Sequence, residues 1–405
     1  MASQPPDGDP APRDGALPPD RLAALGERPF GVYVHVPFCS TRCGYCDFNT
    51  YTAGELGPGS SRSSYLDAVL AEVRLARRVL GPAVPPATTV FFGGGTPTLL
   101  APDELGRLLD AVATTFGIAD DAEVSVEANP DSVDGAALQA LRRNGFTRVS
   151  FGMQSASRHV LQVLDRTHTP GGALRAVADA RAAGFDHVNI DLIYGTPGET
   201  EQDWRDSLQA AASSGADHVS AYALVVEDGT RMAARVRRGE LPAPDDDEAA
   251  ARYLVAEEVL SGSGMRWYEV SNWAKPGGEC RHNLGYWRGD DWWGLGPGAH
   301  SHVRGVRWWN VRHPTAYAAR LADGSSPAQA REVLDSQDRW VEDVLLRVRL
   351  AEGVALDALG PRASVVTARA AADGLAEVDA WRQGRLVLTL RGRLLADAVV
   401  RDLVA

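Results

Sequence analysis

Three cysteines within eight residues form the segment of this sequence best suited to metal chemistry. Cys39, Cys43 and Cys46 lie in CSTRCGYCDF with the spacing C-x3-C-x2-C, just after a predicted strand that ends at Pro37. Three thiolates can hold three irons of a cubane cluster and leave the fourth iron without a protein ligand. An iron with an open position attracts a chelating small molecule. The spacing therefore favours a [4Fe-4S] cluster at this loop.

Zinc is the competing interpretation of the same loop. Structural zinc takes four protein ligands, and His35, Asp47, or the distant Cys280 and His282 could complete such a set. Three unrelated buried thiols are a further alternative, although cysteines clustered on one loop are rarely mere packing residues. The zinc alternative predicts a colourless protein that contains no iron.

A glycine-rich turn follows the second predicted strand. The segment FFGGGTPTLL contains Gly94, Gly95 and Thr96. Glycines there let the backbone come close to a ligand and offer it amide and carbonyl groups. Because a glycine-rich segment after a strand is often only a turn, this segment alone does not establish a binding site.

Polar side chains mark three further predicted strands. Glu127 ends the third strand, Gln154 ends the fourth, and Asp191 lies in the fifth. Each alone could be a structural cap, but buried polar side chains are costly unless they are paired. Their recurrence at the carboxyl ends of parallel strands, where β/α folds place their active sites, favours a shared polar ligand such as a ribose.

These strand ends belong to a repeated strand-helix pattern. The predicted strands are 32–37, 89–94, 123–129, 148–154, 187–195 and 218–225. The stretches between them are amphipathic, and 102–116 opens with proline and two acidic residues, as a helix should. The alternation predicts a parallel sheet with right-handed crossovers, and six units are short of the eight of a closed barrel. We expect an α/β fold, a partial (β/α)6 TIM-like barrel, with a flat doubly wound sheet as the alternative.

The cysteine triplet, with Tyr45 just before its last member, resembles the signature of radical-SAM proteins. The resemblance implies that S-adenosylmethionine (SAM) chelates the open iron through its amino and carboxylate groups, and that one electron from the cluster can cleave it to a 5'-deoxyadenosyl radical. It also implies that Gly94, Gly95 and Thr96 contact the amino group of SAM.

From about Gly31 to the C-terminus, the chain is similar to the relatives of the oxygen-independent coproporphyrinogen III oxidase. The residues at that family's spacing for cluster and SAM contacts are Tyr33, the cysteine triplet, GGGTPT, Glu127, Gln154, Arg166 and Asp191. One departure is Phe48, which stands where the oxidase pattern C-x3-C-x2-C-x-C has a fourth cysteine.

The second departure is HNLGYW (282–287), which resembles the HNxxYW motif of the HemW branch, a set of heme chaperones that share the oxidase's fold. This resemblance implies binding of heme and its delivery to an acceptor protein, for which it suggests a respiratory protein, without coproporphyrinogen oxidase activity. The alternative is a radical-SAM oxidase or decarboxylase acting on coproporphyrinogen III or a related tetrapyrrole.

Heme chemistry fits the composition of this motif. His282 offers an imidazole, which is a common axial ligand to heme iron. Flat apolar surfaces for the porphyrin ring are offered nearby by Tyr286, Trp287, Trp292 and Trp293. Arg281 and Arg288 could pair with its propionates. Alternatively, the Trp-rich segment 267–309, which holds seven of the ten tryptophans, closes one end of the barrel with His282 hydrogen-bonded inside it. The resemblance makes heme the favoured interpretation.

Composition excludes several other classes of protein. The 405 residues carry a net charge of −12 and contain no basic run, which argues against a nucleic-acid partner. Four cysteines, three of them on one loop, do not build a secreted disulfide framework, so we expect a cytoplasmic protein. No apolar run reaches the roughly 20 residues of a membrane span, which leaves at most peripheral membrane contact.

Four regions are expected along the chain. The Pro-, Asp- and Gly-rich residues 1–28 predict a disordered tail, and 29–230 the radical-SAM partial barrel. A Trp-rich connecting region with the heme motif follows over 231–330. A winged-helix-like α+β domain is expected over 331–405, with helices at 338–350 and 363–374, strands at 375–381 and 385–390, and a last helix from Leu394.

Overall fold

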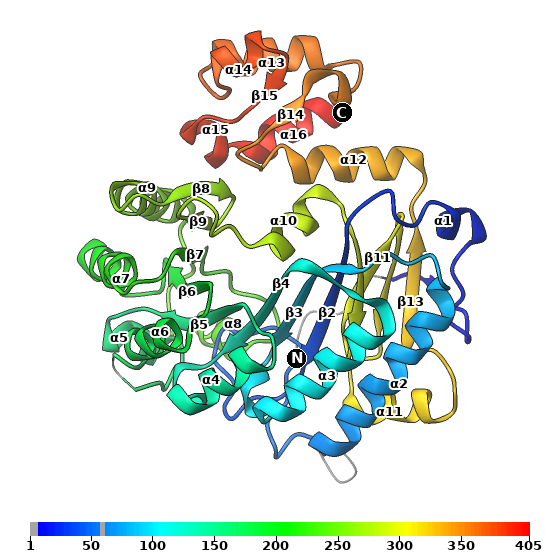
Figure 1. Ribbon diagram of the computed structural model, residues 1–405. Coiled ribbons are helices and arrows are strands. Elements are labelled where there is room, and N and C mark those ends of the chain that lie inside the picture. Colours follow the sequence, from blue (N-terminus) through cyan, green and yellow to red (C-terminus); the bar gives the residue numbers. More distant parts are fainter. Residues whose placement is uncertain (1–6, 57–60, 170) are drawn as a thin grey trace.

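Parallel strands form the centre of the molecule. The computed structural model describes residues 7–56, 61–169 and 171–405, and within them one sheet contains thirteen strands (Figure 1). Six of these are parallel neighbours in chain order: β2 (Phe30–Val36), β3 (Ala87–Gly94), β4 (Ile118–Ala128), β5 (Arg148–Gln154), β6 (His187–Tyr194) and β7 (His218–Ala223). The predicted partial (β/α)6 barrel is thus confirmed.

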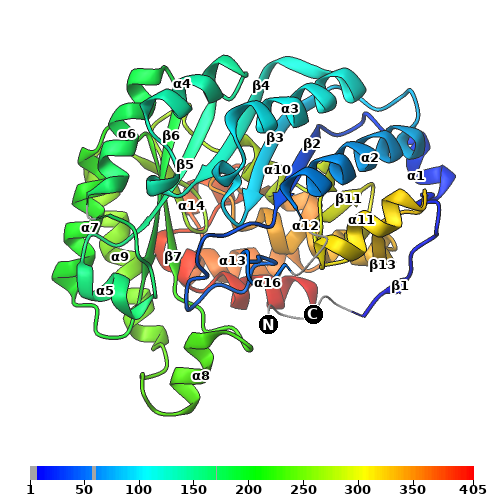
Figure 2. The ribbon, with the colours of Figure 1, turned by 90° about the horizontal axis from the view of Figure 1, so that it is seen from below.

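Helices cover the outer face of the curved sheet (Figure 2). Those that connect the six strands are α2 (Arg62–Leu80), α3 (Pro102–Phe116), α4 (Gly135–Arg143), α5 (Arg158–Val163), α6 (Gly172–Ala183) and α7 (Glu201–Ser213), with 3-10 turns at Pro97–Leu99 and Pro130–Ser132. Helix α3 shows why they form: Pro102 starts it, and Leu105, Leu108 and Val112 bury one stripe against the strands.

The Trp-rich region continues the sheet rather than linking two domains. Its elements are α8 (Arg231–Arg237), α9 (Asp246–Gly262), β8 (Arg266–Glu269), β9 (Asn272–Ala274), α10 (Arg281–Arg288), β10 (Asp291–Leu295), β11 (His300–Val303), β12 (Val306–Asn310), α11 (Pro314–Ala322) and β13 (Ala328–Val333). Strand β10 pairs in parallel with β2, and β11 to β13 extend that edge antiparallel. The rings of Trp293 and Trp308 pack with centroids 4.8 Å apart, so these tryptophans are core residues of the sheet.

The expected disordered tail is partly wrong. Residues 1–6 lie outside the described chain, but β1 (Asp9–Pro10) pairs antiparallel with β13, and α1 (Pro19–Ala23) follows. A Cβ on Gly8 would stand 2.7 Å from the ring of Trp309, so glycine lets the chain lie against that side chain. The pairing of β1 covers part of the outer edge of β13, at Arg331 and Ala330.

The C-terminal domain begins after β13 and has its own hydrophobic cluster. Its elements are α12 (Ser336–Arg347), β14 (Val354–Ala355), a 3-10 turn (Leu356–Leu359), α13 (Ala363–Ala372), α14 (Val378–Arg382), β15 (Arg385–Leu386), α15 (Leu390–Leu394) and α16 (Ala396–Val404). The strand expected over 375–381 is only partly right: Ala376 forms an isolated antiparallel bridge with Leu388, but a helix, α14, begins at Val378, and Trp381 donates to Thr367 of α13 (3.2 Å). Residues 331–333 likewise belong to the large sheet and not to this domain.

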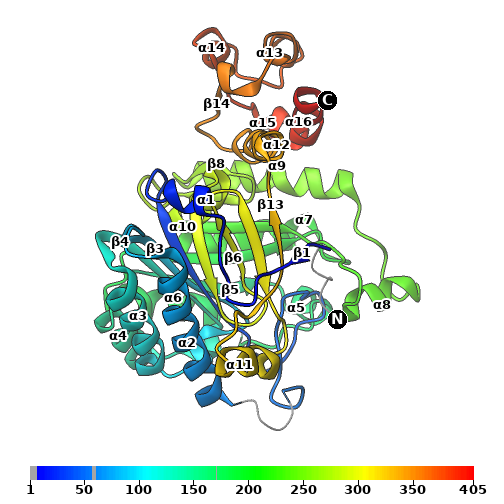
Figure 3. The ribbon, with the colours of Figure 1, turned by 90° about the vertical axis from the view of Figure 1, so that its right-hand side faces the viewer.

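This domain stands at one end of the barrel (Figure 3). Helix α12 packs against α10, which directly precedes β10, and Asp291 at the start of β10 pairs with Phe30 at the start of β2. The domain therefore lies at the amino ends of the parallel strands, and the carboxyl ends remain uncovered by it. None of the described helices is long and apolar enough to cross a membrane.

Candidate functional site

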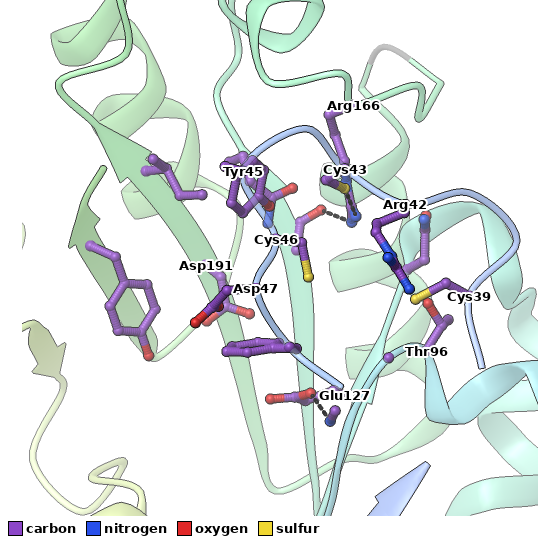
Figure 4. A pocket seen from close by; sticks show the side chains of 18 of the residues that line it. Cys39, Arg42, Cys43, Tyr45, Cys46, Asp47, Thr96, Glu127, Arg166 and Asp191 are labelled. Carbon is purple, nitrogen blue, oxygen red and sulfur yellow. Dashed lines mark hydrogen bonds between the residues drawn. The ribbon is translucent and has the colours of Figure 1, made fainter. Parts of the chain in front are cut away.

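The carboxyl ends of the parallel strands border a cavity of about 380 Å³. Its walls come from the cysteine loop, the turn after β3 and the ends of β4 to β7 (Figure 4). Eleven of the thirteen site residues predicted from the sequence line it: Cys39, Cys43, Tyr45, Cys46, Gly94, Gly95, Thr96, Glu127, Gln154, Arg166 and Asp191. Segments far apart in the sequence thus meet at one place.

Glycines in the turn after β3 position the cysteine loop. The N–H of Gly95 donates to the carbonyl of Val36 (2.8 Å), and the N–H of Thr96 donates to that of Phe38 (2.7 Å). A Cβ at Gly95 would stand 2.4 Å from the Phe38 carbonyl oxygen. Glycine is therefore required for the close approach that fixes the chain directly before the first cysteine.

The cysteine thiols suit a cluster better than a single ion. All three are unpaired and partly buried, yet nowhere in the described chain do three His, Cys, Asp or Glu side chains come close enough to hold one metal ion. Zinc would need such a group, whereas a cubane distributes its thiolates over separate irons. Burial raises the pKa of Cys46 to about 11, so metal binding must displace its proton.

Unpartnered polar atoms in the cavity indicate a missing ligand. Gln154 has a φ of 61°, which is uncommon for a residue other than glycine, and its buried Oε1 has no partner among the described residues. The Nε of Arg166 is equally unpartnered in the described chain, while its Nη1 donates to the sulfur of Cys43 (3.4 Å). Buried groups of this kind are ordinarily satisfied, so a polar ligand fits here.

Two carboxyl groups border the same space. Glu127 accepts the N–H of Gly94 (3.0 Å), and burial, followed by the nearby Asp191, raises its pKa to about 8. Asp191 accepts from the hydroxyl of Ser150 (2.6 Å) and the amide of Asn189 (2.8 Å), and burial raises its pKa too. A bound cation would draw Glu127 into its ionised form.

Tyr33 and His282 are not part of this cavity. Both line a second, inner space of about 310 Å³ nearer the amino ends of the strands. The hydroxyl of Tyr33 lies 3.1 Å from Nδ1 of His35. Glu127 and Asp191 line both spaces, so the inner space adjoins the cluster cavity, and contact of Tyr33 with the cofactor stays a prediction.

His282 is hydrogen-bonded on both sides of its ring. Its Nδ1 lies 2.8 Å from Oγ1 of Thr89, and its Nε2 lies 2.8 Å from the hydroxyl of Tyr286. The ring stacks on Phe91, and burial lowers its pKa to about 4. Both ring nitrogens are bonded in this arrangement, so ligation of heme by His282, which stays a prediction, would require one of these hydrogen bonds to break.

The sequence interpretation missed several residues of the cavity wall. The further residues that line it and bear polar or aromatic side chains include Arg42, Asp47, Phe48, Ser150, Tyr222 and Glu227. Tyr222 could have been found, because it lies near the end of the sixth strand. A position at a strand end was the feature that had selected Glu127 on the third strand. Ser150 gave no such signal, since it lies near the start of its strand, β5.

Comparisons with known proteins agree with this geometry. Residues 33–211 match the Radical SAM superfamily. The chain is 55% identical over 383 residues to the heme chaperone HemW of Mycobacterium tuberculosis, covering 95% of this chain and 97% of that one. It belongs to the HemW family. The heme chaperone HemW of Bacillus subtilis is 32% identical over 324 residues, which cover 80% and 84% of the two chains. The predicted resemblance to the HemW branch is confirmed.

The fold is shared with a solved radical SAM enzyme. The coproporphyrinogen III oxidase HemN of Escherichia coli superposes with a TM-score of 0.78, covers 95% of this chain and 92% of its own, and is 23% identical. Membership of the HemW family, within the radical SAM superfamily, implies a SAM-binding iron-sulfur cluster. The three unpaired thiols and the unpartnered polar atoms of the cavity fit both groups.

Proposed function

We propose that this chain is a heme chaperone that binds heme and transfers it unmodified to an acceptor protein. The observation that carries the proposal is 55% identity, over 95% of the chain, to a protein named as a heme chaperone. Phe48, at the position of the oxidase's fourth cysteine, lines the cluster cavity and argues against the oxidase. The acceptor is a respiratory protein, and the protein works in the cytoplasm, where reducing conditions preserve cluster thiols.

In this proposal Cys39, Cys43 and Cys46 hold a [4Fe-4S] cluster, which supplies an electron at an iron chelated by SAM. The backbone from Gly94 to Thr96 meets the amino group of SAM. The contacts to the rest of SAM come from Tyr45, Glu127, Gln154, Arg166 and Asp191. Arg166 also donates to the sulfur of Cys43 (3.4 Å).

Replacing Glu127 with glutamine tests the SAM site. Since hydrogen bonds to charged groups contribute roughly 1.5–3 kcal/mol, we expect SAM to bind at least about tenfold more weakly to the cluster-loaded variant. A pKa of about 8 for Glu127 means that the neutral form predominates below that pH. Ionised Glu127 attracts the cationic SAM more strongly than the neutral form does. The affinity of the wild type for SAM should therefore rise with pH and level off above about 8.

Calorimetric titration with SAM at several pH values measures both effects. Any pH dependence that comes from the amino group of SAM itself appears in the wild type and in Glu127→Gln alike, so the difference between them reports Glu127. Equal affinities and parallel pH profiles would remove Glu127 from the proposed SAM contacts.

The function itself is tested by offering heme and coproporphyrinogen III to the anaerobically reconstituted protein. We expect a stable heme complex, transfer of heme of unchanged mass to a heme-depleted respiratory cytochrome, and an unaltered porphyrinogen. Conversion of the porphyrinogen, with an equivalent amount of 5'-deoxyadenosine, would contradict the chaperone function and favour the oxidase alternative. Absorbance, mass spectrometry and iron content are followed in the same sample.

A further inference from the structure

Helix α8 projects from the open end of the barrel, as Figure 2 shows. Four arginines lie on this helix or directly after it. Two of them, Arg237 and Arg238, pair with acidic residues of the same segment. The other two reach beyond it: Arg231 donates to the cysteine loop, and Arg235 donates to the end of α5. The contacts that hold α8 are therefore concentrated around the cysteine loop.

The backbone on both sides of Cys43 is bonded to the start of α8. The carbonyl of Arg42, the residue before Cys43, accepts from Nη2 of Arg231. The carbonyl of Gly44, the residue after it, accepts the N–H of Met232 (2.9 Å). The loop therefore cannot turn away at Cys43 without breaking a hydrogen bond to α8.

The first turn of α8 is suited to this contact. Thr230 caps the helix by accepting the N–H of Ala233 (3.0 Å). The N–H of Met232 belongs to the first turn and has no acceptor within the helix, so the carbonyl of Gly44 provides one. The side chain of Met232 is fully buried in a small apolar cluster with residues of α5 and β6, and Tyr45 of the cysteine loop packs against that cluster. Backbone, charged and apolar groups of α8 thus all contact the loop.

Asp165 joins α8 to the same part of the loop. Its φ of 52° is uncommon for a residue other than glycine, and its carboxylate lies 3.8 Å from the guanidinium of Arg231. A Cβ on Gly44 would stand 2.6 Å from Oδ2 of Asp165, so a side chain there would displace the carboxylate. The next residue, Arg166, donates to the sulfur of Cys43 (3.4 Å). The middle cysteine is thus held at its backbone and at its sulfur from outside the loop.

We propose that Arg231 and Met232 are positioning residues for the iron-sulfur cluster, because they hold the backbone on both sides of Cys43. The inference rests on the proposed cluster ligands Cys39, Cys43 and Cys46. A thiolate on a fixed backbone rebinds its iron before the loop can move away, so a held loop retains the cluster for longer. Neither positioning residue lines the cluster cavity, and they therefore act through the loop and not through contact with SAM.

Release of iron from the anaerobically reconstituted full-length protein to a ferrous chelator tests this role. We expect Arg231→Ala to lose iron about two- to tenfold faster than the wild type, the range that one hydrogen bond represents. Arg231→Lys keeps a charged donor and should lie closer to the wild type. Arg237→Ala is the matched control, since its side chain is similarly exposed (60% against 63% for Arg231) but pairs with Asp228 instead. Thermal unfolding without cluster should be nearly the same in all of them, because the replaced side chains are exposed.

Hydrogen exchange tests the N–H of Met232, which no side-chain substitution removes. We expect the peptide that covers α8 to exchange more slowly with the cluster bound than without it, because coupling between two sites is reciprocal. In Gly44→Ala, whose methyl group displaces the carboxylate of Asp165, this peptide should exchange faster and iron should leave faster. Adding Asp165→Gly to that variant frees the space and should restore both in part.

The outcomes separate this role from the cluster itself. Equal rates of iron release in Arg231→Ala and Arg237→Ala, or exchange at α8 that does not respond to the cluster, would overturn the positioning role and leave the proposed cluster ligands in place. A wild type that takes up no iron under the same reconstitution would overturn the cluster.

Discussion

Alanine in place of Cys43 is expected to leave the chain without its iron-sulfur cluster. In the proposed cluster each of the three thiolates would hold a different iron, so the loss of one ligand would expose a second iron and remove the sulfur to which Arg166 donates. After anaerobic reconstitution, iron and sulfide should fall from about four per chain to background, and the brown absorbance should disappear. Iron analysis and absorption spectroscopy of the desalted protein measure this loss.

Cys280→Ala is the matched control for this prediction. Cys280 is a buried thiol outside the cluster cavity, and its sulfur donates to Glu123 (3.4 Å). We expect this variant to take up as much iron as the wild type. Full iron loading of Cys43→Ala, or equal loss in Cys280→Ala, would contradict the triplet as the cluster site, and one zinc without iron in the wild type would establish the zinc alternative.

Local sequence patterns were sufficient to predict the six parallel strands and most of the residues that line the cluster cavity. Strand β5, for example, alternates the apolar residues Val149, Phe151 and Met153 with others and ends in Gln154, and the carboxyl ends of parallel strands meet at one edge of the sheet. The cysteine loop was found because its spacing is short and its chemistry is specific. In each case the prediction depended on residues that are close together in the chain.

Those patterns could not predict how deep along the barrel axis a side chain lies. Tyr33 lies three residues before the end of β2, and each residue of a strand rises about 3.3 Å. Its side chain therefore lines the inner cavity rather than the cluster cavity. Alternation along a strand indicates which face a side chain occupies but not the ligand it reaches.

Pairing between strands that are far apart in the sequence could not be predicted from those patterns either. The prediction treated 231–330 as a connecting region, yet β10 lies beside β2, with Trp292 paired to Gly31 across most of the chain. For α14, the alternating pattern of LAEVDAW resembles a strand, but the tertiary contact of Trp381 with Thr367 belongs to a helix. Such contacts override local propensity.

The helix that carries HNLGYW depends on one buried carboxylate, Glu123. It accepts the N–H groups of Arg281 and His282 at the start of α10 (both 3.1 Å). It also lies 3.4 Å from the guanidinium of Arg148, and both side chains of this pair are at most 4% exposed. One side chain on β4 therefore caps α10 and neutralises a buried charge.

Glu123→Ala is consequently expected to lower the free energy of unfolding by about 3–5 kcal/mol, because an uncompensated buried charge carries a penalty of that size. Asp121→Ala is the control: Asp121 also pairs with Arg281, but its side chain is 81% exposed, and an exposed pair contributes about 1 kcal/mol or less. Thermal unfolding of the two variants without cluster measures the difference. Equal, small losses would mean that Arg148 is satisfied by the Gly278 carbonyl alone, to which it donates at 2.6 Å, and that α10 stays in place without its cap.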